Sequence, residues 1–177
     1  MRLVALPDSI YNTFQPGDII IRKGGGPLSH QLMQISKENY SHCGVIVRDN
    51  NKWKVIQSIS QQEEGGEDGV QLTALKDFVK YTVDSTLFVC RPIITENCSK
   101  RIVEQAYFYL SKKIPFDHRF DLADDSKFYC SELLLHIFMD VFGEIIFKVR
   151  PQHRTFVPLF ETFFDVSKFL PVYQLRK

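Results

Sequence analysis

The stretch Phe128-Tyr129-Cys130-Ser131-Glu132-Leu133-Leu134 predicts the opening of a helix with a cysteine at its tip, and the rest of the chain is interpreted around it. A cysteine at a helix N-terminus lies beside free N–H donors in a positive partial field, and both favour the thiolate. An earlier stretch, Ser41-His42-Cys43-Gly44-Val45-Ile46-Val47, predicts a strand that begins with a histidine. An imidazole beside the thiol would complete an activated nucleophile. The two stretches make the chain a candidate cysteine hydrolase.

Length and composition are those of an ordinary globular chain. With 177 residues, of which 44% are hydrophobic and 24% charged, we expect a single domain over residues 1–177 with a full core. The 22 basic and 21 acidic residues leave a net charge of +1. No strong field favours nucleic acid or an anionic membrane, so we expect no nucleic-acid partner. The sequence leaves the oligomeric state open.

Targeting and thiol signals are weak. No segment has the roughly 20 apolar residues that a membrane span needs. The apolar run within residues 1–8 is too short for a signal peptide, so we expect a cytoplasmic protein, or an exported one if such a peptide has been removed. The four cysteines, Cys43, Cys90, Cys98 and Cys130, match no C-x-x-C metal or redox spacing, and we expect free thiols, most of them buried.

Hydrophobic periodicity and turn residues give a coarse map of the elements. Strands are predicted over 19–22, 42–48, 53–59 and 87–92, and helices over 28–35, 72–81, 99–112 and 130–142. Residues 60–69 and 114–127 are predicted loops, and the aromatic segment after 142 is predicted to be irregular. No repeat, low-complexity tract or linker interrupts the pattern, which predicts one α+β domain.

The two strands 42–48 and 53–59 are predicted to form a hairpin. If residues 50–51 are its two-residue loop, Gly44 lies opposite Gln57. Gln57 then shares a face with His42, one diagonal of about 7–8 Å away, and the glycine leaves room for the contact. A register slip of one residue would send Gln57 to the other face.

An amide at this position has a chemical use. A histidine that serves a thiol as base needs one ring nitrogen turned to the sulfur and the other held by an acceptor. The side-chain carbonyl of Gln57 can accept from the imidazole N–H of His42, and it orients the ring without adding charge. The N–H groups at the start of the helix that begins at Cys130 would stabilise the oxyanion of a tetrahedral intermediate.

The chain resembles a known family, the circularly permuted NlpC-type papain-like hydrolases of the YiiX/YaeF-like branch. The resemblance covers roughly residues 14 to 142. It rests on Pro16-Gly17-Asp18-Ile19-Ile20, Ser41-His42-Cys43-Gly44-Val45-Ile46, Phe120-Asp121 and Phe128-Tyr129-Cys130-Ser131-Glu132-Leu133. It implies an α+β papain-like fold of permuted topology, with an antiparallel sheet packed against helices. The histidine precedes the cysteine here, which is the permuted order.

The resemblance also implies a Cys–His–polar triad, with Cys130 as nucleophile, His42 as base and Gln57 in the third position. This branch often has Glu in that third position, so the departure should weaken the pairing that raises the pKa of the histidine. We further predict that Tyr129 and Ser131 help to form the oxyanion site or to position the substrate.

The implied activity is that of an amidase or peptidase acting on a peptide, cell-wall-like or acylated substrate. One alternative is a thioesterase or acyltransferase acting on lipid acyl groups. Another is a non-catalytic module that binds a peptide or lipid, which Gln57 in place of Glu would favour. We expect no cofactor and no metal, because His42 and Cys130 lack two further ligands at usual spacings.

Structural interpretations compete with several of these roles. A strand-end histidine is often only a surface residue, a hairpin glutamine is commonly solvated, and Tyr129 more often packs than reacts. Glu132 either supports the site or favours the helix N-terminus by its charge, and the charge is the favoured interpretation. Cys43 points away from His42 and is expected to fill the core. The aromatic segment 156–169 is either core or cleft lining, with peripheral lipid contact as a lesser alternative. The remaining histidines are treated as structural: His30, His118, His136 and His153.

Overall fold

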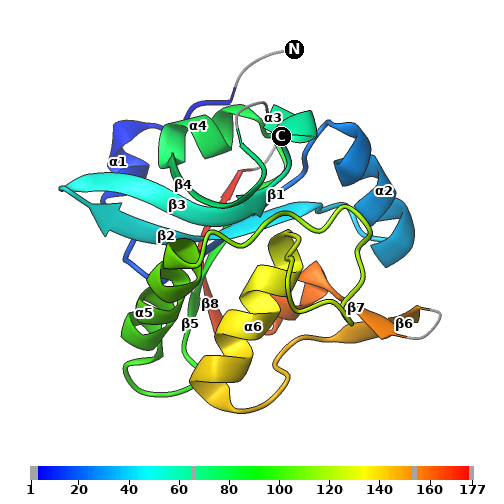
Figure 1. Ribbon diagram of the computed structural model, residues 1–177. Coiled ribbons are helices and arrows are strands. Elements are labelled where there is room, and N and C mark those ends of the chain that lie inside the picture. The colour runs from blue at the N-terminus through cyan, green and yellow to red at the C-terminus, as the bar shows by residue number, and fades with distance from the viewer. Residues whose placement is uncertain (1–3, 65–66, 153–154, 176–177) are drawn as a thin grey trace.

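The computed structural model describes residues 4–64, 67–152 and 155–175, and within them it has an antiparallel six-stranded sheet with helices on both faces (Figure 1). The strand order is β4-β3-β2-β1-β5-β8. The strands are β1 (Ile19–Arg22), β2 (His42–Asp49), β3 (Lys52–Ile59), β4 (Gly69–Ala74), β5 (Leu87–Pro92), β8 (Phe169–Leu175) and the separate pair β6 (Val149–Gln152) and β7 (Thr155–Pro158). The helices are α1 (Asp8–Tyr11), α2 (Pro27–Ser36), α3 (Gln61–Glu64), α4 (Leu75–Lys80), α5 (Cys98–Ser111), α6 (Cys130–Phe142) and the 3-10 helix η1 (Phe160–Phe164). The predicted α+β class is confirmed.

The sheet separates two apolar layers because successive side chains of a strand point to opposite faces. Ile21 and Val45 pack with α5 and α6, which lie below the sheet in Figure 1. Ile20 and Ile46 pack with α4, which lies above it with α1. The strands β1 and β2 are therefore apolar on both faces. Such burial explains why β1 and β2 have continuous hydrophobic runs rather than alternating ones.

The β2–β3 hairpin has the predicted register. Val45 lies opposite Ile56, and the loop residues Asn50 and Asn51 have φ angles of 48° and 60°. Asparagine tolerates this left-handed conformation, which a tight two-residue hairpin turn requires at both positions. The turn therefore sets the register, and the register places Gln57 on the face that the sequence predicted.

The Pro16-Gly17-Asp18 segment holds the start of β1 in place. Gly17 has φ +93°, and a Cβ on it would lie 2.6 Å from the carbonyl oxygen of Ser99, so only glycine fits. The fully buried carboxylate of Asp18 accepts two hydrogen bonds from Arg91, at 2.8 and 2.9 Å, and one from the backbone N–H of Gln15 at 2.8 Å. This part of the family-like sequence is structural.

One predicted helix is wrong in its first part. Residues 72–74 belong to β4, which pairs with β3, and the helix α4 begins only at Leu75. Leu72 packs on the α5–α6 face of the sheet, whereas Leu75 and Phe78 pack on the opposite face. The apolar spacing from Leu72 onward therefore predicted one helix where there are two elements, a strand and a helix. Their apolar side chains pack on opposite faces of the sheet. The predicted loop 60–69 also contains the short helix α3.

The prediction of an irregular C-terminal segment is wrong as well. β8 pairs with β5 and completes the edge of the sheet, with a register shift where Pro171 lies opposite Cys90. Proline lacks the N–H that a regular ladder needs, so it occurs on edge strands and at bulges. Phe160, Phe163 and Phe169 are fully buried, whereas Phe164 is 40% exposed. Most of this aromatic segment is core.

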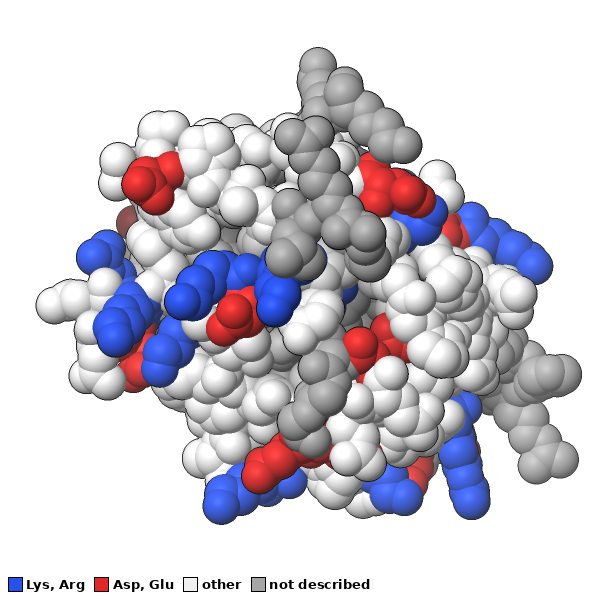
Figure 2. All heavy atoms as spheres, turned by 90° about the horizontal axis from the view of Figure 1, so that it is seen from above, with Lys and Arg blue, Asp and Glu red and all other residues white. Residues whose placement is uncertain are grey.

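The surface carries mixed charge. Figure 2, which views the molecule from above, shows basic and acidic side chains interspersed on that face rather than gathered into a field of one sign. None of the helices in the described ranges is both long enough and apolar enough to cross a bilayer.

Candidate active site

The N-terminus of α6 is fixed by hydrogen bonds to both polar atoms of the peptide group that joins Phe128 to Tyr129. The backbone N–H of Tyr129 donates to the carboxyl group of Glu132 at 3.1 Å, in a capping interaction across the first turn. The carbonyl oxygen of Phe128 accepts from the hydroxyl of Ser58 on β3 at 2.5 Å. The helix therefore begins at Cys130 with its first turn tied to the sheet.

The sulfur of Cys130 lies against the start of β2. Its Sγ is 3.5 Å from the carbonyl oxygen of Ser41, the residue before the histidine. Cys130 and His42 line the same small cavity, and both are more than nine-tenths buried. The fold thus brings together His42 and Cys130, which are 88 residues apart in the sequence.

His42 is held by hydrogen bonds that run through the side-chain amide of Gln57, on the face of the sheet that α4 covers. Its Nε2 lies 2.5 Å from Oε1 of Gln57, and the Gln57 amide donates to the hydroxyl of Thr73 at 2.8 Å. The imidazole stacks on the ring of Phe78, with 5.3 Å between ring centroids. With Gln57 accepting at Nε2, that nitrogen carries the proton and Nδ1 remains as the basic nitrogen.

Gly44 makes this pairing possible. A Cβ at Gly44 would overlap Cγ1 of Val55, and it would lie 2.8 Å from the carbonyl oxygen of Ile56 and 3.3 Å from Cβ of Gln57. Any larger residue would push β3 and its glutamine away from β2. The predicted room between His42 and Gln57 is therefore confirmed.

The electrostatic setting favours a thiolate at Cys130. Burial alone would raise the pKa of this thiol, but hydrogen bonds from Cys43 and His42, the charge of His42 and the backbone N–H of Cys43 lower it, so that it lies well below its ordinary value. Each donor stabilises the anionic sulfur more than the neutral thiol.

A buried arginine that belongs to none of the quoted motifs adds positive charge. Arg22 lies opposite His42 in the β1–β2 pairing, with its guanidinium 4.8 Å from the ring centroid of Phe78 and donating to the carbonyl oxygen of Tyr81 at 2.8 Å. Burial lowers the pKa of Arg22 to about 10, against the negative charges of Cys130 and Glu63, which raise it. It is still charged at neutral pH. The sequence signal that could have identified Arg22 is a basic residue at the end of a buried apolar strand.

The cavity beside the sulfur is small and mostly apolar. Its volume is about 20 Å³, room for about one water molecule. Glu63 on α3 accepts hydrogen bonds from the backbone N–H and the hydroxyl of Ser29 on α2, both at 2.9 Å, and so closes one side. The apolar part of the lining comes from α2, β3 and the loop before α6: Leu28, Leu32, Ile59, Phe116 and Phe120. The predicted loop 114–127 thus contributes two aromatic walls to the site.

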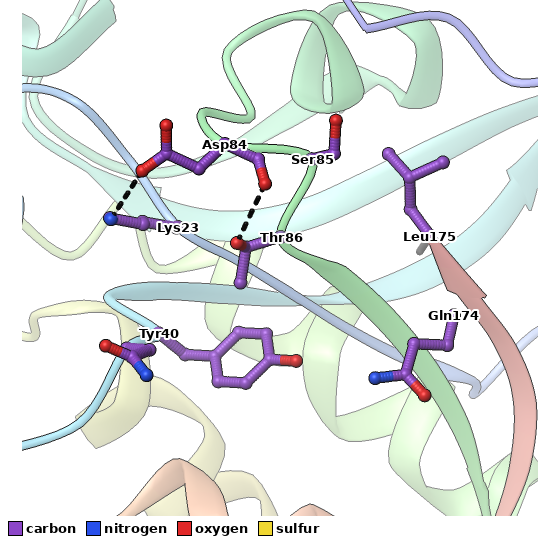
Figure 3. Close-up of a pocket in the computed structure, with 8 residues that line it drawn as sticks. Lys23, Tyr40, Asp84, Ser85, Thr86, Gln174 and Leu175 are labelled. Atoms are coloured by element: carbon purple, nitrogen blue, oxygen red, sulfur yellow. Dashed lines mark hydrogen bonds and ion pairs between the residues drawn. The ribbon is translucent and has the colours of Figure 1, made fainter. Parts of the chain in front are cut away.

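A larger pocket of about 440 Å³ lies elsewhere and contains neither Cys130 nor His42 (Figure 3). Lys23 and Asp84 form an ion pair of 2.6 Å at its rim, and Tyr40 and Gln174 line it. It offers polar groups but no paired nucleophile and base. The chemistry of the side chains, rather than the volume of the hollow, therefore identifies the candidate site.

The side chains of Tyr129 and Ser131 lie in the core rather than in the wall of the cavity. Both side chains are fully buried, the ring of Tyr129 packs edge-on against Phe120 at 5.1 Å, and neither residue lines the cavity beside Cys130. Their backbone N–H groups belong to the start of α6, where a helix supplies no acceptor of its own for its first N–H groups. A role for them at the oxyanion stays a prediction.

Glu132 acts through a neutral carboxyl group. Burial raises its pKa to about 9, with the Tyr129 N–H opposing and the charges of Asp117, Asp125 and Asp124 adding to the rise. Glu132 is therefore mainly protonated at pH 7. The interpretation of this residue as a charge at the helix terminus is wrong, and it caps the helix as a hydrogen-bond acceptor instead.

The other histidines lie outside the cavity lining. His30 contacts the carbonyl oxygen of Gly26, His118 pairs with Asp68 at 2.9 Å, and His136 stacks on Phe128 with 4.3 Å between ring centroids. His153 lies outside the described residues. Within the part of the chain that the structure describes, no three His, Cys, Asp or Glu side chains are grouped so that they could hold a metal ion.

The chain is similar to known proteins in sequence and in fold. Residues 13–152 match the model of a family described as permuted papain-like amidase enzyme, YaeF/YiiX, C92 family. The chain is 26% identical over 144 residues to the protein YiiX of Escherichia coli (strain K12), a match covering 80% of this chain and 65% of that protein, just under two thirds of its length. A crystal structure of a protein described as metalloprotein yiiX from Escherichia coli O157:H7 superposes with a TM-score of 0.75 at 19% identity, covering 92% of this chain and 98% of that one.

Proposed function

This chain belongs to the family of permuted papain-like amidase enzymes of the YaeF/YiiX type, and from that premise we propose that it hydrolyses an amide bond with Cys130 as nucleophile and His42 as base. The match to the solved structure shows the permuted papain-like fold, as the sequence predicted. The assignment of catalytic residues is supported by one observation above others. His42 is held through Nε2 by Gln57 while it shares a cavity with the buried sulfur of Cys130.

The proposed reaction is acyl transfer to water. His42 takes the thiol proton, and the sulfur of Cys130 attacks the substrate carbonyl carbon. The N–H groups at the start of α6 hold the oxyanion of the tetrahedral intermediate. Collapse of that intermediate breaks the C–N bond, and the imidazolium of His42 gives its proton to the leaving amine. Water, deprotonated by His42, then cleaves the thioester and returns the thiol.

The lining of the cavity supports a substrate with an apolar acyl side. Leu28, Leu32 and Phe116 lie around the sulfur, whereas the polar groups of the cavity are engaged with one another, as Glu63 is with Ser29. We therefore propose a small peptide or an acylated amine as substrate. The same apolar lining favours one second candidate, a thioesterase or acyltransferase of lipid acyl groups, in which the sulfur attacks an ester or thioester.

Gln57 bears on the alternative of a non-catalytic binding module. That alternative rested on an amide in place of the carboxylate common in this branch. Here the amide reaches the imidazole of His42 and is itself oriented by Thr73. A neutral acceptor fixes the ring as a carboxylate would, with less stabilisation of the imidazolium. The contact therefore supports catalysis over simple binding.

The solved relative from Escherichia coli O157:H7 is described as a metalloprotein. In this chain the described residues offer no group of three or more His, Cys, Asp or Glu side chains that could hold a metal ion. At the site, His42 and Cys130 share the cavity with Glu63, and the carboxyl group of Glu63 is already engaged by Ser29. Stable transition-metal sites use three or four protein ligands. The residues present do not fit a resident metal, and we derive no step through one.

The proposal is tested by turnover. Short N-acyl peptides, peptide anilides, acyl esters and acyl thioesters are supplied to the wild-type protein and to Cys130→Ser, with Cys98→Ser as a matched control at another buried thiol. We expect hydrolysis of amides that falls by roughly 10³-fold or more in Cys130→Ser and is unchanged in Cys98→Ser. Intact mass after rapid quenching should show an acyl group on Cys130.

Two outcomes decide against parts of this account. Amide hydrolysis at the wild-type rate in Cys130→Ser would refute the nucleophile. Turnover of acyl esters and thioesters without any turnover of amides would replace the amidase proposal by the second candidate.

A further inference from the structure

Two of the four thiols of the chain lie together in the core. Cys43 is fully buried and belongs to the same apolar cluster as Cys130. It points away from His42, as the strand alternation predicts, but the face to which it points is the one that α6 covers. The residue expected to be a simple core filler therefore lies on the side of the sheet that carries the proposed nucleophile.

The position of the Cys130 sulfur over β2 gives the geometry. Its Sγ is 3.5 Å from the carbonyl oxygen of Ser41, two residues before Cys43, so the sulfur lies against the start of β2. The backbone N–H and the thiol of Cys43 are also among the hydrogen-bond partners that lower the pKa of Cys130. The Cys130 sulfur therefore rests on the segment from which the Cys43 side chain projects.

The two thiols differ in access. Cys130 lines the water-sized cavity, whereas Cys43 does not. Cys43 is also the less acidic of the pair, since burial and then its contact with Cys130 raise its pKa well above the ordinary value. Oxidation follows thiolate character and contact with solvent-sized space, so Cys130 is attacked first.

We propose that Cys43 is the resolving thiol of Cys130, so that a peroxide converts the pair into a reversible intramolecular disulfide. The Cys130 thiolate attacks one peroxide oxygen; an S–O bond forms, the O–O bond breaks, and the released hydroxide leaves as water after protonation. The Cys43 sulfur then attacks the sulfenyl sulfur, an S–S bond forms, the S–O bond breaks, and a second water leaves with the Cys43 proton. The two sulfurs are oxidised and the peroxide is reduced.

The pair protects the nucleophile. A sulfenic acid with no thiol beside it proceeds to sulfinic acid, which is irreversible by ordinary reductants. A disulfide is inactive but returns to two thiols when an external dithiol exchanges with it. This inference rests on the nucleophilic Cys130 of the proposed function, but its readout is the mass of the protein rather than turnover.

The experiment oxidises the full chain with a few equivalents of hydrogen peroxide at neutral pH, blocks free thiols with N-ethylmaleimide, and maps peptides without reduction. Weighed before the blocking step, the wild-type protein should have lost about 2 Da, and its digest should give a linked Cys43–Cys130 peptide that dithiothreitol reverses. In Cys43→Ala and in the near-isosteric Cys43→Ser, Cys130 should instead gain about 32 Da irreversibly. Cys90→Ala, which removes a buried thiol on β5, should behave as the wild type.

The outcomes separate this inference from the proposed function. Oxidation of Cys130 while Cys43 stays available to the maleimide would overturn the resolving role alone. The same reversible protection of Cys130 in Cys43→Ser as in the wild type would also overturn it. Oxidation of Cys130 no faster than that of Cys90 and Cys98 would count against both, since both require an activated sulfur.

Discussion

At the scale of single residues, the site depends on how one neutral amide orients one imidazole. Gln57 is fully buried. Its side-chain carbonyl oxygen accepts a hydrogen bond from Nε2 of His42, and its amide NH2 group donates one to the hydroxyl of Thr73. A buried polar group with both ends satisfied is held in one rotamer. The result is an imidazole held through Nε2, with Nδ1 left outside this contact, in the cavity that Cys130 also lines.

Gln57→Ala removes the acceptor and leaves the ring free to turn. We expect kcat to fall by roughly 10- to 100-fold, since the base is then correctly oriented only part of the time. Gln57→Glu keeps the contact but adds a negative charge, which stabilises the imidazolium form of the ring. The acidic limb of the kcat/KM profile should therefore move to higher pH.

The control for this prediction is Gln71→Ala. Gln71 lies opposite Gln57 in the β3–β4 pairing, but its amide donates to the carbonyl oxygen of Glu67 at the surface. The kcat of the Gln71→Ala protein and the pH profile of its kcat/KM should match those of the wild type. A Gln57→Ala protein with the wild-type kcat and the wild-type pH profile would show that the amide does not orient the base.

At the scale of elements, the first residue of α6 is Cys130, and the neutral carboxyl group of Glu132 stabilises this end of the helix. The carboxyl group of Glu132 accepts from the Tyr129 N–H inside the core, where burial holds its pKa at about 9. The protonated acid is compatible with an apolar surrounding, whereas the ionised form is not. The position of Cys130 is thereby linked to pH.

The sign of the pH effect follows from the two pKa values of Glu132, about 9 when folded and 4.5 in the unfolded chain. Between them the folded state binds more protons than the unfolded state, so the free energy of unfolding falls as pH rises, by at most about 1.4 kcal/mol per pH unit. The stabilisation is complete below about pH 4.5 and is lost toward pH 9. Glu132→Gln keeps an acceptor without a titrating proton.

Urea unfolding at pH 5.5 and pH 8.5 measures this linkage. The wild type should lose more stability between the two pH values than Glu132→Gln does, and the variant should be the more stable of the two at the higher pH. Equal pH dependence in both proteins would show that Glu132 is ionised in the folded state at neutral pH.

At the scale of the whole molecule, an ion pair with a fully buried carboxylate joins the segment before β1 to the neighbouring strand β5. Asp18 has no exposed side-chain surface, and Arg91 reaches both of its oxygens as well as the carbonyl oxygen of Thr13. The backbone N–H of Gly17 donates to the carbonyl oxygen of Ile46 at 2.8 Å in the same place. This junction fixes β1 between β2 and β5, and β1 carries Arg22 to the site.

Asp18→Ala leaves the Arg91 guanidinium without its partner in a mostly buried place. We expect a loss of about 3 kcal/mol in the free energy of unfolding, because breaking a buried pair leaves one charge uncompensated. The matched control is Glu104→Ala, which removes an exposed partner 4.0 Å from Lys100 and should cost under about 0.5 kcal/mol. Urea unfolding with unchanged m-values measures both, and equal losses in the two variants would contradict this account of the junction.

Local signals in the sequence were enough for the parts of the site built from neighbouring residues. The Asn50-Asn51 turn fixed the register that brings Gln57 to the face of His42, and periodicity with Gly143 at the end bounded α6. Parts that depend on pairing between distant segments were not predictable in this way. β8 forms a strand because β5 offers it an open edge, and Leu72 continues β4 because β3 lies beside it.

The same limit applies to the residues of the site. The strand pattern showed that Cys43 points away from His42, but only the packing of α6 on that face places it beside Cys130. Arg22 ends an apolar strand, and its place opposite His42 depends on the pairing of β1 with β2. The raised pKa of Glu132 arises from burial, which a single helix sequence does not reveal.

The most direct test of the central claim is the pH dependence of alkylation at Cys130. Limiting iodoacetamide is added over a range from about pH 5 to pH 9, and peptide mass spectrometry gives the rate at each cysteine. The account predicts that at about pH 6 Cys130 reacts faster than Cys90 and Cys98, with an inflection well below the ordinary thiol value that moves upward in His42→Ala. Equal rates at the three cysteines, or an inflection that His42→Ala leaves in place, would contradict it.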